Sequence, residues 1–411
     1  MQRWFLLMIS TLSFGGIALT AQAATTITNP AAKQTIPTSY DRTNKSASYQ
    51  GVSHQLTTNQ GLRYQTYFYL PSYFAKADPH RNIYQGGVMV GHYLYLVESY
   101  NNNTTGNLVK INLTAAKKLK LTTSDRGAMA RAYHYFDPKT TSGQQHQATY
   151  QIRKTRLAKL KRQLKTTIAK LASQTKQVKK ARTKAIRQRL TKQLAKTKAT
   201  KKQLTKQQTT LTKQQAPAVF YKKVQAVSVV GPTIETGHGQ ALGYDTKHKR
   251  LFIYSSHAMQ PKLQVVNQTK LTTTTTYQAS GTQPSVLTFD TSGHAYCGIF
   301  KGQDYYLYEG NYQGKTLQFK LQLIIKDQMT DQNQGLSYDA HNQRLYLLGD
   351  GGMTSLPVNK LRQKTLTASD LHNVTFNSTK EFENLTFDAQ GYGYLTTLYS
   401  PELFKSQHPL P

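Results

Sequence analysis

The feature that most restricts the fold of this chain is a pattern shared by four of its segments. Each has a polar residue, a short apolar run that ends at Asp, a polar turn, and a second run rich in aromatic residues. The four copies are anchored at Gln240, Ser285, Gln334 and Glu383, with spacings of 45, 49 and 49 residues. Strand–turn–strand units at this spacing are typical of the four-stranded blades of a β-propeller.

Two weaker copies lie at Gly86 and Ala132. They raise the expected number of blades to six, with five and seven as alternatives. The last copy has too little chain for four strands, so we expect N-terminal residues 59–70 to supply the missing strands and close the ring. The predicted class is an all-β propeller, and closure would remove the exposed strand edges.

Residues 151–215 differ from the rest of the chain. They contain 22 Lys or Arg and no Asp, Glu, Gly or Pro. Apolar residues recur seven apart, which is the pattern of a coiled coil. One column consists of Leu157, Leu164, Leu171 and Val178, and continues after a phase break with Leu190, Thr197, Leu204 and Leu211. A second column consists of Leu160, Ile168, Ile186 and Leu194.

A single helix of this length would extend about 97 Å at 1.5 Å per residue. Its two ends could not both return to one propeller. We therefore predict an antiparallel α-helical hairpin that is inserted into one blade and turns near residues 179–184. No Gly or Pro marks this turn.

The N-terminus has the pattern of an export signal. Arg3 precedes an apolar stretch over residues 4–20, and Ala21–Ala23 supplies the small residues of a cleavage site. An uncleaved membrane anchor is the alternative, but a Gly15–Gly16 pair interrupts the stretch and no basic stop-transfer cluster follows. We expect cleavage after Ala23 and a secreted protein, extracellular and held non-covalently at a cell surface.

The predicted organisation follows from these segments. It comprises a signal peptide over 1–23, a flexible leader over 24–50, the propeller's first part over 51–150, the hairpin over 151–215, and the propeller's second part over 216–411. The single cysteine, Cys297, excludes an intrachain disulfide and is expected to be a buried, inert thiol.

The formal net charge is +34, which bears on partners rather than on the fold. Because the hairpin has no acidic residues, a polyanion along it would relieve repulsion and release counterions. We predict contact with anionic wall polymer or a membrane surface, without sequence-specific nucleic-acid recognition; the alternative is a solvated spacer. The predicted contact residues are Lys159, Lys170, Lys179, Lys180, Arg182, Lys184, Arg187, Arg189, Lys201 and Lys202.

A second candidate site is the mouth of the propeller channel, just before each innermost strand. Its predicted residues are Gln60, His238, Gln240, Gln283, Gln332, Gln334, Glu381 and Glu383. Amides, one imidazole and two carboxyls suit a polar or glycan ligand, although they could equally cap strand ends and hold water. The sequence has no recognisable metal-ligand spacing, nucleophile elbow or phosphate-binding loop, so we predict neither metal nor cofactor.

Two stretches, 238–254 and 381–399, resemble helveticin J-type proteins of Gram-positive bacteria. That resemblance implies a bacteriocin-like protein that kills related bacteria; the basic hairpin has no counterpart in the family, and no catalytic residue carries over. The sequence as a whole predicts a non-enzymatic binding protein of the bacterial cell envelope. The alternative is a bacteriolytic or glycan-cleaving hydrolase that uses residues such as Glu381 and Glu383. The oligomeric state stays open.

Overall fold

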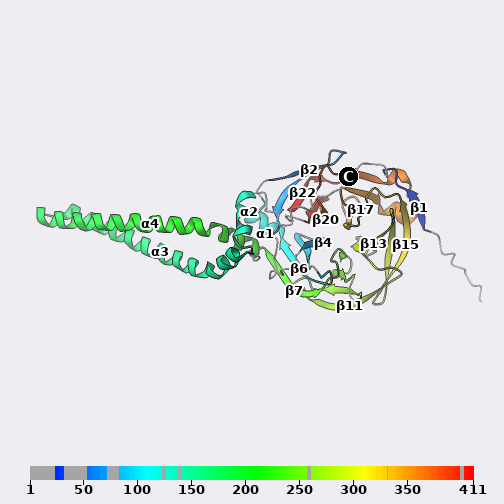
Figure 1. The fold of residues 1–411 in the computed structure, drawn as a ribbon, viewed down its shortest axis with the longest axis horizontal. Helices are drawn as coiled ribbons and strands as arrows, with labels where there is room; N and C mark the ends of the chain where they lie inside the picture. Colours follow the sequence, from blue (N-terminus) through cyan, green and yellow to red (C-terminus); the bar gives the residue numbers. More distant parts are fainter. Residues whose placement is uncertain are drawn as a thin grey trace, which may run out of the picture.

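The computed structural model describes residues 24–31, 53–71, 83–100, 102–122, 126–137, 140–256, 261–330, 332–398 and 402–411. Most of its strands form five four-stranded antiparallel units, which we call blades 1 to 5 and which surround a common centre (Figure 1). Neighbouring blades contact each other through their innermost strands, and the contacts close into a ring from blade 5 back to blade 1. The architecture is therefore a β-propeller.

The blades have the following strands, given from the centre outwards. Blade 1 consists of β4 (Ile83–Val90), β5 (Tyr93–Ser99), β6 (Thr105–Asn112) and β7 (Ser228–Glu235). Blade 2 consists of β8 (Leu242–Asp245), β9 (Arg250–Tyr254), β10 (Leu263–Val266) and β11 (Thr273–Ser280). Blade 3 consists of β12 (Val286–Phe289), β13 (Ala295–Lys301), β14 (Asp304–Gln313) and β15 (Thr316–Lys326).

Blade 4 consists of β16 (Gly335–Asp339), β17 (Arg344–Gly349), β18 (Gly352–Pro357) and β19 (His372–Thr375). After β18 come the short helix α5 (Val358–Gln363) and the 3₁₀ turn η1 (Ala368–Asp370). Blade 5 consists of β20 (Phe382–Phe387), β21 (Tyr392–Thr397), β22 (Glu402–Pro409) and the N-terminal β3 (Arg63–Tyr69), with β2 (Gln55–Thr57) at its edge. The antiparallel pairing of β3 with β22 confirms that N-terminal strands close the ring.

The described blades number five, which is one of the alternatives to the expected six. The weak copy at Ala132 is not a blade, because this residue lies in a helix, α2 (Arg126–Tyr135). Its aromatic residues pack against blades 5 and 1: Tyr133 is buried in a cluster with core residues of both blades and donates a hydrogen bond from its hydroxyl to the carbonyl of Tyr69 in β3 of blade 5. The same residue types can serve a strand or an amphipathic helix over a short window, and the tertiary contacts decide between them.

The Asp that ends each repeat fixes a tight turn. Oδ1 of Asp290 accepts hydrogen bonds from the backbone N–H groups of Ser292 and His294, both at 2.9 Å. Oδ1 of Asp388 accepts in the same way from the N–H groups of Gln390 and Tyr392, at 3.1 and 3.0 Å. The N–H groups of such a turn have no backbone acceptor, and the Asp carboxylate supplies one. This requirement explains why Asp recurs at the end of the first strand of each repeat.

The leader predicted for residues 24–50 is wrong over its first part. β1 (Thr25–Thr28) pairs in parallel with the outer strand β15 of blade 3, and Ile27 is buried. The amide of Asn29 is 2% exposed and donates to the side-chain oxygens of Gln328 and Asn373. Pairing with an open sheet edge, rather than an apolar pattern of its own, orders this polar segment. The predicted signal peptide lies outside the described residues.

The helical insertion lies between β6 and β7 of blade 1, which confirms that it interrupts a single blade. It comprises α1 (Leu113–Lys118), α2, α3 (Thr141–Lys180) and α4 (Lys184–Ala226). The turn at 181–183 falls within the predicted range, and Thr183 caps α4 by accepting from the N–H group of Ile186. In place of a glycine signal, this polar cap starts the second helix.

The hairpin is longer than the predicted 151–215 at both ends. α4 continues through Pro217, although proline removes one hydrogen bond from a helix interior. Its last turns are stabilised by packing, since Val224 is fully buried in a cluster with Met129 and Tyr133 of α2 and with core residues of blade 1. Tertiary contacts of this kind outweigh an unfavourable local residue. We call residues 141–226 the basic arm.

The aromatic residues of the strands mainly build the core. The largest fully buried side chains include seven tyrosines, so these aromatic rings serve mainly to pack the core. Cys297 is free and fully buried, and burial raises its thiol pKa well above the ordinary value, as expected for an inert thiol. Among the described helices, none is long and apolar enough to cross a membrane.

Candidate functional sites: the basic arm and the central channel

The basic arm projects away from the propeller, and α3 and α4 lie side by side along it (Figure 1). The residues of α3 that face α4 are spaced three and four apart, as in a coiled coil. Leu157, Leu164, Leu171 and Val178 form one column of this seam, as predicted. The second predicted column is only partly correct, because Ile168 and Ile186 are 46% and 44% exposed.

Polar residues occupy several places in the seam, including Thr197 of the first column. Gln174 of α3 and Thr197 and Gln215 of α4 are buried at the seam. Oε1 of Gln174 and Nε2 of Gln215 have no hydrogen-bond partner in the part of the chain that the structure describes. A seam with buried amides and a single leucine column is less stable than one with two apolar columns, but it fixes the register.

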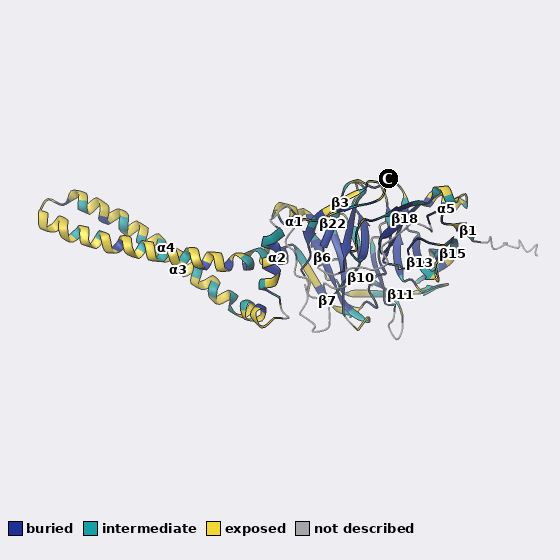
Figure 2. Ribbon diagram, turned by 45° about the horizontal axis from the view of Figure 1, so that its top comes forward, coloured by how far each residue is buried: buried dark blue, intermediate teal, exposed yellow. Residues whose placement is uncertain are grey.

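The ten predicted polyanion-contact residues lie on the arm, and nine of them are exposed. Lys201 differs: it is half-buried beside the seam, because its stem covers apolar surface between the helices. The exposed helix surfaces dominate the view of the arm in Figure 2. The arm carries 24 of the chain's 53 basic residues and no acidic residue.

Among the described residues, no ion pair joins a cation of the arm to an acidic residue. Examples of ion pairs lie in the propeller, such as Lys262–Glu235 at 2.6 Å and Lys405–Asp388 at 3.3 Å. Of the arm's basic groups, Arg153 donates to the Tyr135 hydroxyl at 2.6 Å, Arg187 to the Ala181 carbonyl at 3.2 Å and Lys222 to Oε1 of Gln225 at 2.6 Å. None of these contacts neutralises charge, so the positive field of the arm is open to solvent.

Three of the predicted channel residues lie at equivalent places in their blades. Gln240, Gln334 and Glu383 form a ring around the channel together with Ser285 and Gln85. Gln85 was missed because the first blade was aligned on Gly86. That glycine allows a close approach, since a Cβ there would lie 2.5 Å from the Gln240 carbonyl oxygen.

Part of the ring is satisfied by hydrogen bonds between buried side chains. Nε2 of Gln240 donates to Oε1 of Gln334 at 2.8 Å, and this bond joins blade 2 to blade 4 across the channel. Nε2 of Gln334 in turn donates to Oδ1 of Asp350 at 3.2 Å. These bonds occupy the two amides with each other and with a carboxyl, whereas Oε1 of Gln85 has no hydrogen-bond partner among the described residues.

Glu383 is the most perturbed group of the ring. It is 2% exposed, and its pKa is raised well above 4.5, first by burial and then by the charges of Glu381 and Asp350, while a hydrogen bond from Gln85 opposes the rise. Its Oε2 has no hydrogen-bond partner among the described residues. A carboxyl so enclosed is favoured in its neutral form and is out of reach of a polymeric glycan, which weakens its case as a hydrolytic acid.

The other predicted channel residues lie elsewhere. Gln60 is wrong as a channel residue: it is exposed in the turn between β2 and β3, at the outer edge of blade 5, and donates to the Asn373 carbonyl at 2.8 Å. Gln283 and Gln332 are exposed in loops before the ring, and His238 and Glu381 are half-buried there. The described residues include no group of three His, Cys, Asp or Glu that could hold a metal ion.

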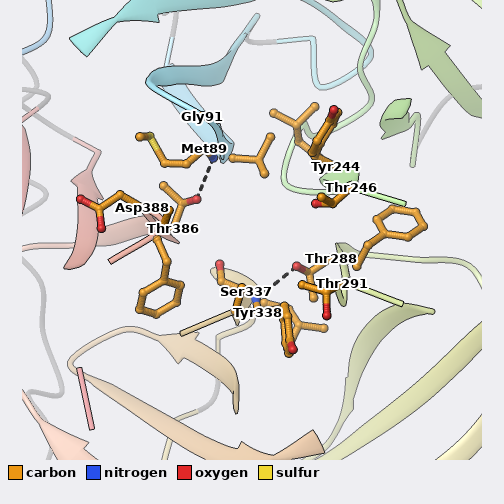
Figure 3. Close-up of a pocket in the computed structure, with 18 residues that line it drawn as sticks. Met89, Gly91, Tyr244, Thr246, Thr288, Thr291, Ser337, Tyr338, Thr386 and Asp388 are labelled. Carbon is orange, nitrogen blue, oxygen red and sulfur yellow. Dashed lines mark hydrogen bonds between the residues drawn. The ribbon is translucent and has the colours of Figure 1, made fainter. Parts of the chain in front are cut away.

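A cavity of about 190 Å³ lies at the opposite end of the channel, where the innermost strands end (Figure 3). Side-chain hydroxyls join neighbouring blades along its wall: Oγ1 of Thr386 accepts from the Met89 N–H at 2.9 Å, and Oγ1 of Thr288 from the Tyr338 N–H at 3.2 Å. At roughly 30 Å³ per water, the cavity has room for about six water molecules, the size of one small polar ligand. The sequence pattern did not single it out, because its threonines read as ordinary strand residues.

Comparisons with known proteins place the chain only distantly. No family model matches it, and no curated protein matches it either. Among solved structures, the Dos1 propeller matches at 10% identity over 42% of this chain and 42% of that one, with a TM-score of 0.24. A luciferin-regenerating enzyme matches at 13% identity over 36% of this chain and 51% of that one, with a TM-score of 0.23.

A third solved structure, the gluconolactonase XC5397 from Xanthomonas campestris, matches at 11% identity over 41% of this chain and 71% of that one, with a TM-score of 0.25. The chain spans about half the length of the first two structures. At these scores the matches carry no statement about the activity of this chain. Its propeller architecture rests on the strand pairing described above.

Proposed function

We propose that this protein is secreted and binds anionic polymers of the bacterial cell envelope through its basic arm. The observation that carries the proposal is the arm's uncompensated charge: 24 basic residues, no acidic residue and no ion pair from the arm in the described part of the chain. Like charges this close repel each other, since the Debye length is about 8 Å at physiological salt. An external polyanion removes that repulsion and releases its own counterions.

The propeller serves as the rigid base of the arm. α2 and the end of α4 share one core cluster with the strands of blade 1, so the arm is anchored by buried apolar contacts. An arm held in this way keeps its cations away from the acidic residues of the propeller. The resemblance to helveticin J-type proteins is compatible with an envelope target.

The test is retention on bacterial cells and on purified wall polymers, measured for the full chain and for a variant that lacks residues 151–215. We expect retention of the full chain to fall steeply between low and high salt, and the variant not to be retained. Circular dichroism and thermal unfolding of the variant check that its propeller is folded. Retention that is indifferent to both salt and the deletion would refute the proposal.

The cavity at the far end of the channel supports a second, smaller role for the propeller, namely binding of one small polar or glycan ligand. Its size and its threonine and serine hydroxyls suit a hydroxylated molecule. Titration of monosaccharides, followed by NMR, tests this role. The expected result is shifts of cavity residues that are lost in a Thr386→Val variant, and unchanged spectra would exclude it.

A further inference from the structure

The cations of the arm surround it rather than cover one side. In α3, positions a and d of the heptad face α4, and each of the five remaining positions carries two basic residues. In the order b, c, e, f, g these are Lys165 and Lys179, Lys159 and Lys180, Lys154 and Lys161, Arg162 and Lys176, and Arg156 and Lys170. In α4, nine of the twelve basic residues occupy positions b, c, e and f, and the other three, Arg187, Lys201 and Lys222, lie at position a beside the seam.

The arm has no apolar face that could enter a bilayer. Its exposed large hydrophobic side chains are Ile152, Ile168, Ile186 and Val219, at 70%, 46%, 44% and 50% exposure. By heptad position they are divided between two sides of the arm: Ile152 and Ile186 lie at c of α3 and g of α4, and Ile168 and Val219 lie at e of each helix. Helices that lie in a membrane interface instead gather cations on one face and apolar residues on the other. A flexible polymer therefore fits the surface of the arm better than a planar membrane does.

One polymer strand cannot neutralise the whole arm. Each helix with its side chains is about 10–12 Å wide, so the pair measures roughly 20 Å across its longer section. At a Debye length of about 8 Å, a charge on one side is largely screened from the other. A strand bound along one face therefore leaves the attraction of the opposite face almost unchanged.

The number of charges on the arm also exceeds what one polymer strand can neutralise. α3 has 40 residues and so extends about 60 Å at 1.5 Å per residue. A single strand with one charge per 3.4 Å, the spacing of one DNA strand, brings roughly 18 charges over this length. The arm carries 24, so it remains positive after one such strand has bound along its full length.

We infer that the arm bridges anionic polymers: it binds two or more flexible linear polyanion chains at once, on opposite faces, and so cross-links them. This inference rests on the proposed function and names its partner as a linear polymer rather than a membrane surface. In an antiparallel pair, e positions lie opposite e positions and g opposite g. The hairpin thus has one broad face with the e and b cations and another with the c and g cations.

Two matched variants test the inference. The first replaces the e and b cations Lys154, Lys161, Lys165, Lys179, Lys184 and Lys198 with Gln, and the second replaces the c and g cations Arg156, Lys159, Lys170, Lys180, Arg189 and Lys196 with Gln. All twelve side chains are exposed, each variant removes six charges, and Gln is a good helix former, so the arm should keep its helicity. Circular dichroism checks this point.

The probe is long-chain inorganic polyphosphate, with light scattering for bridging and analytical ultracentrifugation for stoichiometry. We expect the wild type to bind more than one chain and to scatter strongly. Both variants should lose bridging to a similar extent yet still bind a single chain, with affinities within about threefold of each other.

Three results separate the possible failures. A wild type that binds one chain only, or a loss of binding confined to one of the two variants, would overturn bridging and leave the proposed function intact. Preference for phosphatidylglycerol vesicles over polyphosphate, with sensitivity to one face alone, would assign a membrane as the partner instead. Absence of any salt-sensitive binding by the wild type would remove the proposed function itself.

Discussion

Replacement of Glu383 by Gln should stabilise the propeller at neutral pH and weaken the pH dependence of its stability. The carboxyl is 2% exposed beside Glu381 and Asp350, and its folded-state pKa is raised well above 4.5. The folded protein therefore keeps a proton that the unfolded chain releases near the ordinary pKa. Gln has the same shape, stays neutral at every pH and remains within reach of Gln85.

The sign and size of this stability difference follow from proton linkage. Because the pKa of Glu383 is raised in the folded state, its contribution to the free energy of unfolding is intact below about pH 4.5. This contribution is lost as the pH rises towards the folded-state pKa. While the folded state alone holds the proton, the free energy of unfolding falls by about 1.4 kcal/mol per pH unit. Burial also raises the pKa of Asp339, but that effect is common to both proteins and cancels in their difference.

Urea unfolding at several values between pH 5 and pH 8 measures this difference. The gap between the variant and the wild type should widen as the pH rises, with the variant more stable. Parallel profiles, or a variant that is less stable throughout, would refute the reasoning. A Gln283→Glu variant, changed at an exposed position in the loop before the ring, controls for a general effect of charge.

Three further predictions concern the ends of the chain and its chemistry. Asn29→Ala should lower the free energy of unfolding by about 1–3 kcal/mol, because it removes one donor each from the buried side-chain oxygens of Gln328 and Asn373. Thr26→Ala at an exposed position should change it little, and chemical denaturation checks both. Mass spectrometry of the exported protein should find Ala24 as its first residue, and an intact residue 1 would refute the export signal. Zymography on cell-wall substrate should show no clearing zone, and a zone that disappears with Glu383→Gln would replace binding by hydrolysis.

The propeller could be predicted because its signal is periodic and local. The Asp of each repeat marks a turn whose backbone needs an acceptor, so Asp290 and Asp388 indicate the turn between the two innermost strands of a blade without any knowledge of the rest. The seam of the arm could be read for the same reason, since the leucines of α3 repeat every seven residues. The turn at 181–183 followed from the length of the insertion rather than from its residues.

The remaining features depend on contacts that no short window contains. β1 is ordered by the edge of β15, some 300 residues away, and its own composition is that of a flexible segment. Ala132 lies in a strand-like aromatic pattern, yet packing against blade 1 makes it helical. Gln60 precedes a strand, as the channel residues do, but that strand lies on the outer side of blade 5. It lies there because the N-terminal strand closes the ring by pairing with β22.

The most direct test of the account is the salt dependence of polyanion binding. With fluorescently labelled polyphosphate, the logarithm of the binding constant is plotted against the logarithm of salt concentration for the full chain and for the chain without residues 151–215. If six to ten charges are contacted, the full chain should lose about 10³–10⁵ in affinity between 50 and 200 mM salt, and the shortened chain should show little binding at either. A nearly flat line for the full chain, or equal slopes for both chains, would contradict the claim that the exposed cations of the arm bind an external polyanion.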